Sequence, residues 1–281
     1  MSQQKRFETV QSNGKTLHID VYEADTANPV IIFIPGMGCY AGIYEEFLSG
    51  LAGEGFTVIG VDLPGHGRSS GARGVFTFDE IMTAISDIVS YSIDRYHERV
   101  GLMGSSLGGT FALYAAMHEK RLKAVLCHDA MDISRDLPVP ARFPRVIRFL
   151  TRLRFLADLM PRLPVPLRLL VNWSHVVESP LMLDSIIQDK NMVWYYSLGS
   201  WNSFLAYRPS GELGRISVPL KIIVGDRDLL FTPVHCKKIA ERIGMSGAPV
   251  EVLKGGHALP LEKISRTIDV SRRWFKEKLR N

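Results

Sequence analysis

The sequence predicts a protein of the α/β class, with a mostly parallel eight-stranded sheet and helices on both of its faces. Short apolar runs rich in branched residues end in glycine or turn residues, as buried strands do. Longer segments with helical apolar spacing lie between these runs, and strands that alternate with helices build parallel sheets. The chain has 281 residues, of which 46% are hydrophobic and 22% charged. This is enough for one large domain, or for a core that carries an insertion.

The expected strands can be placed one after another along the chain. The first two alternate polar and apolar residues and flank Ser12, Asn13 and Gly14, which indicates a hairpin. The next six are nearly continuous apolar runs, which is typical of strands that are buried on both faces. In chain order, the strands are expected within residues 6–11, 16–24, 29–36, 56–65, 99–106, 122–130, 219–228 and 249–256.

Helical spacing between the strands predicts five core helices. They are expected near residues 43–53, 77–97, 107–118, 233–244 and 262–278. The alternation of strands and helices breaks between about 133 and 205, where prolines are frequent and the apolar spacing is helix-like. We therefore expect a mainly helical cap at residues 133–205, inserted after the sixth strand. Residues 1–132 and 206–281 then form the core.

The net charge of +5 is concentrated in one segment of the expected cap. Residues 135–168 contain eight arginines, two aspartates and no lysine, so the rest of the chain is close to neutral. Arg145, Arg148 and Arg152 lie on one face of an expected helix at 145–160. That face could contact anionic lipid or attract acidic substrates. We favour the plainer alternative, a solvated face over a packed cap, because Arg154 falls on the apolar side.

Other features narrow the class of protein. No apolar stretch approaches the roughly 18 residues that span a membrane, and the polar start of the chain predicts a cytoplasmic protein. Cys39, Cys127 and Cys236 are scattered and flanked by apolar residues, which predicts buried thiols rather than disulfides or a metal site. The arginine segment is broken by prolines and no binding module is recognisable, so we expect no nucleic-acid partner.

The stretch "GLMGSSLGGTF", residues 101–111, follows an expected strand and opens an expected helix. In this context a G-x-S-x-G pattern forms a nucleophile elbow, a sharp turn that exposes a serine. Gly104 and Gly108 frame the pattern, so Ser106 takes the central position and Ser105 the variable one. The alternative is a glycine-rich turn with an ordinary serine, because the pattern alone is common.

A serine nucleophile needs a base and an acid that orients the base. Of the eight histidines, His257 lies in a glycine-flanked loop directly after the last expected strand. The acid should follow the preceding strand, and we favour Asp228 over Asp226, which we assign to the turn. Asp129, at the end of the sixth strand, is a less favoured acid. The order Ser106, Asp228, His257 matches one known chain order of Ser-His-Asp triads.

Three stretches together resemble the α/β-hydrolase superfamily, in its monoacylglycerol lipase, lysophospholipase and esterase-like branch. They are "VDLPGHGRSSG" after the fourth strand, "GSSLGG" at the elbow and "GGH" at the histidine loop. The resemblance covers about residues 6–132 and 206–280, while the cap matches in position alone. It implies an α/β-hydrolase fold. It also implies that His66 and Asp62 organise a loop and take no part in the triad.

The resemblance further implies an oxyanion hole made of two backbone amides, those of Leu107 and Met37. Leu107 follows the nucleophile, and Met37 lies in "IPGMGCYAG" after the third strand. Here the chain departs from the family, which usually has His-Gly where this sequence has Pro35-Gly36. An amide donor does not depend on that side chain, but its usual support is missing.

These residues predict a serine hydrolase that cleaves lipid-like or medium-chain carboxylic esters through an acyl-enzyme. We expect a small acyl ester as its partner and no metal or organic cofactor. Trp194, Tyr195 and Trp201 in the cap are candidate substrate-binding residues, or else part of the core of the cap. The same triad also serves thioesterases, amidases, carbon–carbon bond hydrolases and acyltransferases. A receptor or scaffold that binds a ligand without turnover is the alternative from another class.

Overall fold

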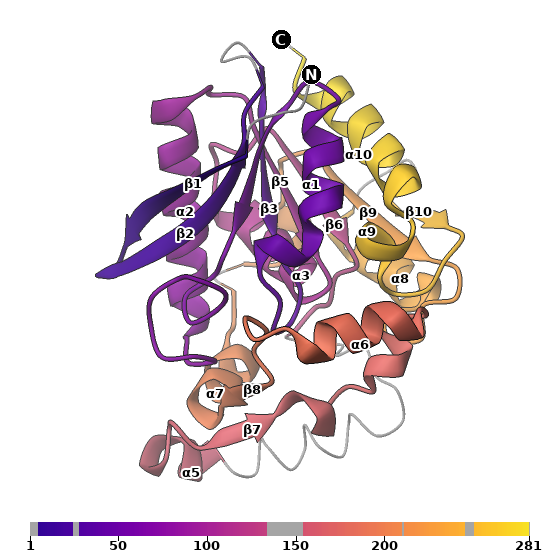
Figure 1. The fold of residues 1–281 in the computed structure, drawn as a ribbon. Helices are drawn as coiled ribbons and strands as arrows, with labels where there is room; N and C mark the ends of the chain where they lie inside the picture. The colour runs from indigo at the N-terminus through magenta and orange to yellow at the C-terminus, as the bar shows by residue number, and fades with distance from the viewer. Residues whose placement is uncertain (1–4, 25–27, 134–153, 210, 245–249, 281) are drawn as a thin grey trace.

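A sheet lies at the centre of the molecule between two layers of helices, and a cap lies beyond one end of this sheet (Figure 1). The computed structural model describes residues 5–24, 28–133, 154–209, 211–244 and 250–280. Within them the expected fold class is confirmed, because eight strands form one mostly parallel sheet with helices on both faces.

The eight strands of the sheet occur in the spatial order β1-β2-β4-β3-β5-β6-β9-β10. The first two form the predicted antiparallel hairpin, β2 is antiparallel to β4, and the remaining neighbours are parallel. The strands are β1 (Lys5–Ser12), β2 (Lys15–Tyr22), β3 (Val30–Ile34), β4 (Thr57–Val61), β5 (Val100–Ser105), β6 (Ala124–His128), β9 (Leu220–Gly225) and β10 (Val250–Leu253).

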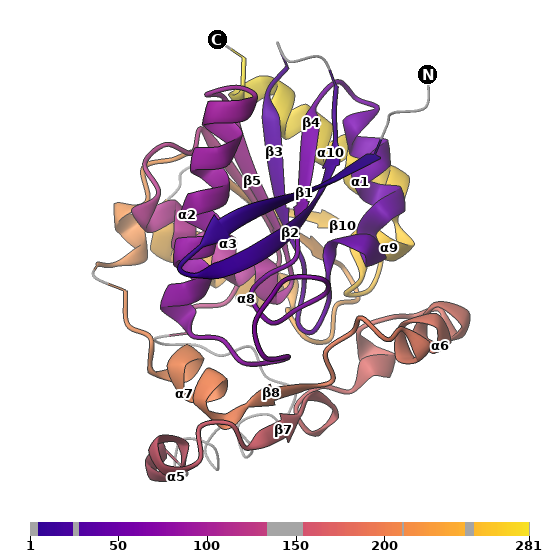
Figure 2. The ribbon, with the colours of Figure 1, turned by 60° about the vertical axis from the view of Figure 1, so that its left-hand side comes forward.

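Helices cover the sheet from both sides, as Figures 1 and 2 show. One face packs against α1 (Glu45–Ala52), α9 (Leu259–Glu262) and α10 (Ile264–Lys278). The other face packs against α2 (Phe78–Arg95), α3 (Leu107–His118) and α8 (Pro233–Ile243).

The helices next to the sheet begin and pack as their sequences dictate. Thr77 and Glu80 form a capping box at the start of α2, in which each side chain accepts from the other residue's amide. Every residue of α3 from Leu107 to Met117 is buried, because this helix lies directly behind the sheet. The turn that precedes α3 is therefore held by a fully packed element.

The cap lies beyond the carboxyl ends of the parallel strands (Figure 2). Its described α-helices and strands are α5 (Arg154–Leu159), β7 (Pro164–Pro166), α6 (Pro180–Gln188), β8 (Tyr195–Ser197) and α7 (Leu198–Ala206), and two short 3-10 helices, Leu167–Leu169 and Trp173–His175, lie between β7 and α6. The cap contains a two-stranded antiparallel sheet, β7 with β8, which the sequence did not predict. Most of the arginine-bearing helix expected at 145–160 lies outside the described residues.

Polar contacts fasten the cap to the core loops that follow β3 and β4. The Ser197 amide donates to the carbonyl oxygen of Gly74 at 2.9 Å, and the Tyr40 hydroxyl donates to Asp189 at 2.7 Å. In the opposite direction, the Ser200 hydroxyl accepts from the Phe76 amide at 2.9 Å. The cap is thus seated on the loops that surround the carboxyl edge of the sheet.

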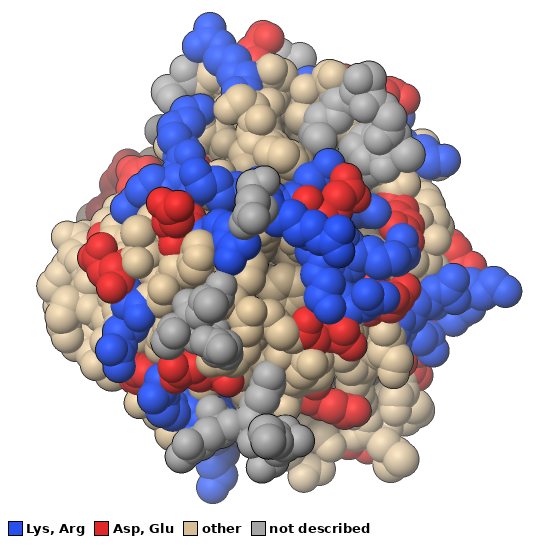
Figure 3. Space-filling model, turned by 90° about the horizontal axis from the view of Figure 1, so that it is seen from above, with Lys and Arg blue, Asp and Glu red and all other residues tan. Residues whose placement is uncertain are grey.

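The end of the molecule opposite the cap carries basic and acidic side chains side by side (Figure 3).

All three cysteines are buried and free, as predicted. None of the helices in the described parts of the chain has the length and apolar character needed to cross a membrane.

Candidate active site

Ser106 stands at the turn between β5 and α3. Its backbone angles, φ 57° and ψ −116°, are rare for a residue with a side chain and are strained by on the order of 1–3 kcal/mol. A Cβ at Gly104 would collide with the carbonyl oxygen of Gly108, so the turn requires glycine at that position. The Ser106 amide donates to the carbonyl oxygen of His128 at 2.8 Å, which ties the turn to β6. The expected strand–turn–helix context of a nucleophile elbow is present.

The structure brings Ser106, His257 and Asp228 together from three separate loops at the carboxyl edge of the sheet. Nε2 of His257 lies 2.9 Å from Oγ of Ser106, and Nδ1 lies 2.8 Å from Oδ2 of Asp228. Both His257 and Asp228 are buried. Because Nδ1 donates its proton to the carboxylate, Nε2 presents its lone pair to the serine hydroxyl.

The surroundings of Asp228 keep its carboxylate ionised. Burial raises the pKa of Asp228, but His257 and the amides of Phe231 and Leu230 lower it below its ordinary value. These amides donate to Oδ1 at 2.8 and 2.7 Å. Conversely, burial lowers the pKa of His257, and the Asp228 carboxylate, with the Asp129 carboxyl group beside it, raises it above its ordinary value. Asp228 can therefore stabilise the imidazolium that forms when a serine proton is taken up.

The loop after β3 reaches the elbow from the other side. A Cβ at Gly36 would lie 3.4 Å from the Cβ of Ser106, so the two backbones nearly touch. Met37 is half-buried and lines the same cleft as Ser106 and His257. Leu107 is the first residue of α3, and amides of a first helical turn have no carbonyl partner within their helix. Both residues predicted for the oxyanion hole thus flank Ser106.

Two tyrosine hydroxyls hold the amides on either side of Met37. The Gly36 amide donates to Tyr44 at 3.3 Å, and the Gly38 amide donates to Tyr196 at 2.7 Å. Tyr44 precedes α1, whereas Tyr196 belongs to β8 of the cap. Burial raises the pKa of both hydroxyls, so they remain protonated. These bonds fix the peptide groups around Met37, and they provide the support that the sequence lacks at Pro35-Gly36.

The direction of the hydrogen bonds at Tyr196 follows from its neighbour His66. Nδ1 of His66 lies 3.0 Å from the carbonyl oxygen of Pro64, which can only accept, so Nδ1 carries the ring proton. Burial lowers the pKa of His66 to about 4, so the ring is neutral. Nε2 of His66 therefore accepts the Tyr196 hydroxyl proton at 2.9 Å. His66 anchors a cap tyrosine, which is consistent with the loop role that the resemblance implied.

Tyr196→Phe should lower kcat for a reaction at Ser106 with little change in KM. The ring keeps its contacts with Phe76 and Trp201, but the buried Gly38 amide loses its acceptor. An unpartnered buried N–H costs about 1–3 kcal/mol, which corresponds to about a 5- to 160-fold fall in kcat. Steady-state kinetics measure both constants. Tyr195→Phe, at the neighbouring residue that is 42% exposed, is the matched control and should match the wild type. A wild-type kcat in Tyr196→Phe would contradict this role.

Ser106 and His257 face a cleft between the core and the cap. None of the described residues that line it is Asp, Glu, Lys or Arg. On the cap side the lining consists of the apolar residues Leu170, Val171, Trp173, Val176, Val177 and Ile186. Sequence analysis missed these residues, although the apolar stretch "LLVNWSHVV" at 169–177 was a signal for them.

The three aromatic residues singled out in the cap do not belong to the described lining, which corrects their expected binding role. Trp201 is buried against Tyr196 and Phe204, in the core of the cap. Tyr195 is exposed, and Trp194 packs against Trp173, which itself lines the cleft. The alternative interpretation, that these residues build the cap, agrees better with the structure.

Asp62 and Asp226, two other carboxylates considered in the sequence analysis, each accept hydrogen bonds within a loop. Asp62 accepts from the amides of Ala41 and Arg68, each at 2.8 Å, and organises its loop. Asp226 accepts from the Gly255 amide at 2.9 Å, which is a turn role.

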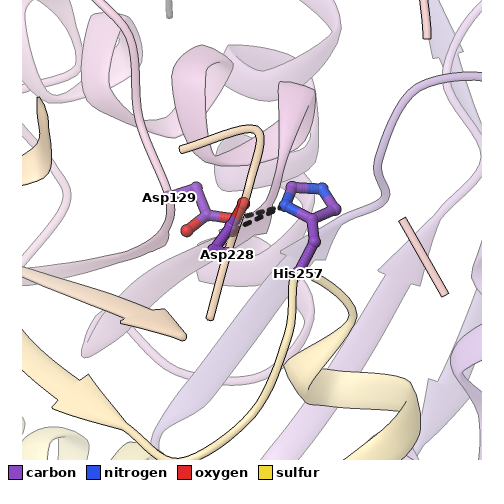
Figure 4. Close-up of side chains that lie close together, drawn as sticks. All are labelled: Asp129, Asp228 and His257. Atoms are coloured by element: carbon purple, nitrogen blue, oxygen red, sulfur yellow. Dashed lines mark hydrogen bonds and ion pairs between the residues drawn. The ribbon is translucent and has the colours of Figure 1, made fainter. Parts of the chain in front are cut away.

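Asp129, the less favoured acid, has Oδ2 only 3.1 Å from Nδ1 of His257 (Figure 4). Asp129, Asp228 and His257 are close enough together to ligate a metal ion. However, an Nδ1 that carries a proton cannot be a metal ligand.

Comparison with known proteins agrees with this architecture. The family model described as "Serine aminopeptidase, S33" matches residues 25–263. A protein of Mycobacterium phage D29 named "Putative non-heme haloperoxidase" is 34% identical over 101 residues, which are 36% of this chain and 35% of that protein.

Two solved structures share the fold. The monoacylglycerol lipase of Paleococcus ferrophilus has a TM-score of 0.76 at 21% identity, covering 93% of this chain and 99% of that one. A soluble variant of monoglyceride lipase from Saccharomyces cerevisiae has a TM-score of 0.80 at 15% identity, and the match covers 100% of this chain and 97% of that one.

The family match includes the elbow, both candidate acids and the histidine loop, and it spans most of the chain. The eight-stranded sheet agrees with it, and the expected superfamily is confirmed. The chain belongs to the serine aminopeptidase S33 family of α/β hydrolases.

Proposed function

We propose that this α/β hydrolase cleaves carboxylic esters with an apolar, lipid-like or medium-chain acyl group, using Ser106 as nucleophile. The observation that carries the proposal is the unbroken chain of contacts from Asp228 through His257 to Ser106, at the edge of an apolar cleft. A hydroxyl with a base beside it, and a buried acid behind that base, can attack a carbonyl carbon.

In this mechanism Nε2 of His257 takes the hydroxyl proton as Oγ of Ser106 attacks the ester carbonyl carbon. The carbonyl oxygen becomes an oxyanion, which the amides of Leu107 and Met37 stabilise by about 3 kcal/mol each. His257 then gives the proton to the leaving alcohol, and the acyl group stays on Ser106. A water molecule, deprotonated by His257, attacks the acyl-enzyme, releases the carboxylic acid and restores the serine hydroxyl.

The lining of the cleft favours an ester over a peptide. The family description names an aminopeptidase, and such an enzyme must hold a protonated α-amino group, which calls for a carboxylate in the cleft. No acidic residue is among the described lining residues. The apolar side chains on the cap side instead match a hydrocarbon chain, which is consistent with the monoglyceride lipases of similar fold.

The test is a series of p-nitrophenyl esters from acetate to dodecanoate, run with monoacylglycerol and lysophospholipid. Each methylene that the cleft buries contributes about 0.8 kcal/mol, so kcat/KM should rise about fourfold per methylene until the cleft is full. Ile186 lines the cleft from α6, so Ile186→Trp should shorten the preferred acyl chain while leaving acetate hydrolysis intact. Ile187→Trp, at the adjacent exposed residue, is the matched control and should keep the wild-type profile.

Equal rates for all chain lengths, or hydrolysis confined to aminoacyl substrates, would contradict the proposed substrate class. An Ile186→Trp variant that loses acetate and octanoate hydrolysis equally would place the acyl chain outside this cleft.

A further inference from the structure

A second buried carboxyl group, that of Asp129, lies beside Asp228 and His257 (Figure 4). Asp129 follows β6 and has a left-handed backbone, with φ 62°. Its Oδ2 lies 3.1 Å from Nδ1 of His257, the same nitrogen that donates to Asp228 at 2.8 Å. One oxygen of each carboxyl group and a ring nitrogen of His257 lie within 4.8 Å of one another.

Asp129 lacks the donors that hold Asp228 in its charged form. Asp228 accepts from the amides of Leu230 and Phe231, whereas neither oxygen of Asp129 has a hydrogen-bond partner among the described residues. Asp129 is also fully buried. A buried carboxylate without donors takes up a proton, and two adjacent carboxyl groups do not both stay ionised. The pair therefore holds one negative charge, on Asp228.

Among the described residues, the other titratable groups around Asp129 supply no compensating positive charge. Nε2 of His128 lies 3.3 Å from Oδ2, but burial lowers the pKa of His128 to about 3, so its ring is neutral. Burial raises the pKa of the Cys127 and Cys236 thiols, so these are neutral as well. Consistent with this environment, burial and the adjacent Asp228 raise the pKa of Asp129 well above its ordinary value.

We propose that Asp129 is a reserve acid: it is protonated in the resting protein, which leaves the negative charge on Asp228, and it replaces Asp228 as the acid when that residue is removed. The inference rests on the proposed function, because it concerns the same triad. Without Asp228, Asp129 is the carboxyl group next to Nδ1 of His257. It then releases its proton to solvent and accepts the hydrogen bond from Nδ1.

The first test removes the acids singly and together and measures kcat for a p-nitrophenyl ester. Asp228→Ala should lower kcat by about 10- to 100-fold, whereas loss of the only acid of a triad costs about 10⁴-fold. Asp129→Asn should have little effect on its own. The double variant should show the full loss of about 10⁴-fold, because no acid remains. An Asp228→Ala variant as inactive as the double variant would overturn the proposal.

Alanine is chosen at Asp228 for a geometric reason. An asparagine oxygen would keep accepting from the amides of Leu230 and Phe231, and its NH₂ group would then face Nδ1 and favour the wrong tautomer. Asp226→Asn, in the same loop, is the matched control. It should change neither the wild type nor the Asp228→Ala variant.

The pH profile supplies a second readout. The imidazole must be neutral to take the serine proton, so kcat/KM falls as pH drops through the pKa of His257. An ionised Asp129 would raise that pKa further than the hydrogen-bond contact of a protonated Asp129 does. Asp129→Asn should therefore leave the pH at which kcat/KM has fallen to half of its maximum at its wild-type value. A shift to lower pH by about one unit or more would show that Asp129 is ionised in the resting protein.

An infrared measurement keeps the proposal testable if Asp228→Ala does not fold. The difference spectrum between the wild type and Asp129→Asn at neutral pH should show the loss of a protonated-carboxyl C=O band. Loss of carboxylate bands instead would overturn the proposal. This readout needs no substrate. If the wild type hydrolyses no ester, the proposed function fails while the proton on Asp129 is still measured separately.

Discussion

Ser106→Ala should abolish ester hydrolysis, with kcat lower by at least about 10⁴-fold and the fold retained. The variant lacks the attacking oxygen, so only the oxyanion hole and substrate binding remain to favour the reaction. Its KM should change little, because the apolar lining of the cleft is intact. Turnover of p-nitrophenyl butyrate, covalent labelling by a fluorophosphonate probe and the thermal unfolding midpoint measure the three parts of this prediction.

Ser105→Ala is the matched control, because the two serines are adjacent. The Ser105 side chain is buried, and its hydroxyl lies 2.9 Å from Nδ1 of His128. Removing it leaves His128 without that partner and should destabilise the fold by about 1 kcal/mol. Turnover and labelling should persist. Labelling of Ser106→Ala, or its absence in Ser105→Ala, would assign the nucleophile to Ser105 instead.

The core of the fold could be predicted because its elements are local patterns. All five residues of β3 are buried, and α2 begins at Phe78, close to the start expected from its helical apolar spacing. The small sheet of the cap could not be predicted. Its strands have three residues each, and Pro164 and Pro166 stand in β7, where proline normally argues against a strand.

The meeting of Ser106, Asp228 and His257 could be predicted because each of them follows a recognisable strand. The support of the oxyanion loop could not, since Gly38 and Tyr196 are 158 residues apart and only the docked cap brings them together. The role of Asp129 could be predicted only in part. Its place at the end of β6 was visible, but its approach to His257 depends on β6 lying beside β9 in the sheet.

Gly108→Ala should damage the oxyanion hole without touching the triad. A Cβ at this position would collide with the carbonyl oxygens of Ile34 and Pro35. These are backbone atoms, so the end of β3 and the loop with Met37 must move away from the elbow. Loss of one oxyanion donor lowers kcat by about 10²–10³-fold. The overpacking should also destabilise the fold by about 1–3 kcal/mol.

The control for Gly108→Ala is Gly214→Ala, whose Cβ would meet, among the described residues, only the carbonyl oxygen of Arg242, at an ordinary 3.5 Å. It should behave like the wild type. Fluorophosphonate labelling separates the oxyanion hole from general damage, because the phosphoryl oxygen of the probe needs the same two amides as an ester carbonyl. Labelling and kcat should therefore fall together in Gly108→Ala, while KM, which depends on the apolar cleft, stays near its wild-type value. Normal labelling with a reduced kcat would place the damage elsewhere than at the Met37 and Leu107 amides.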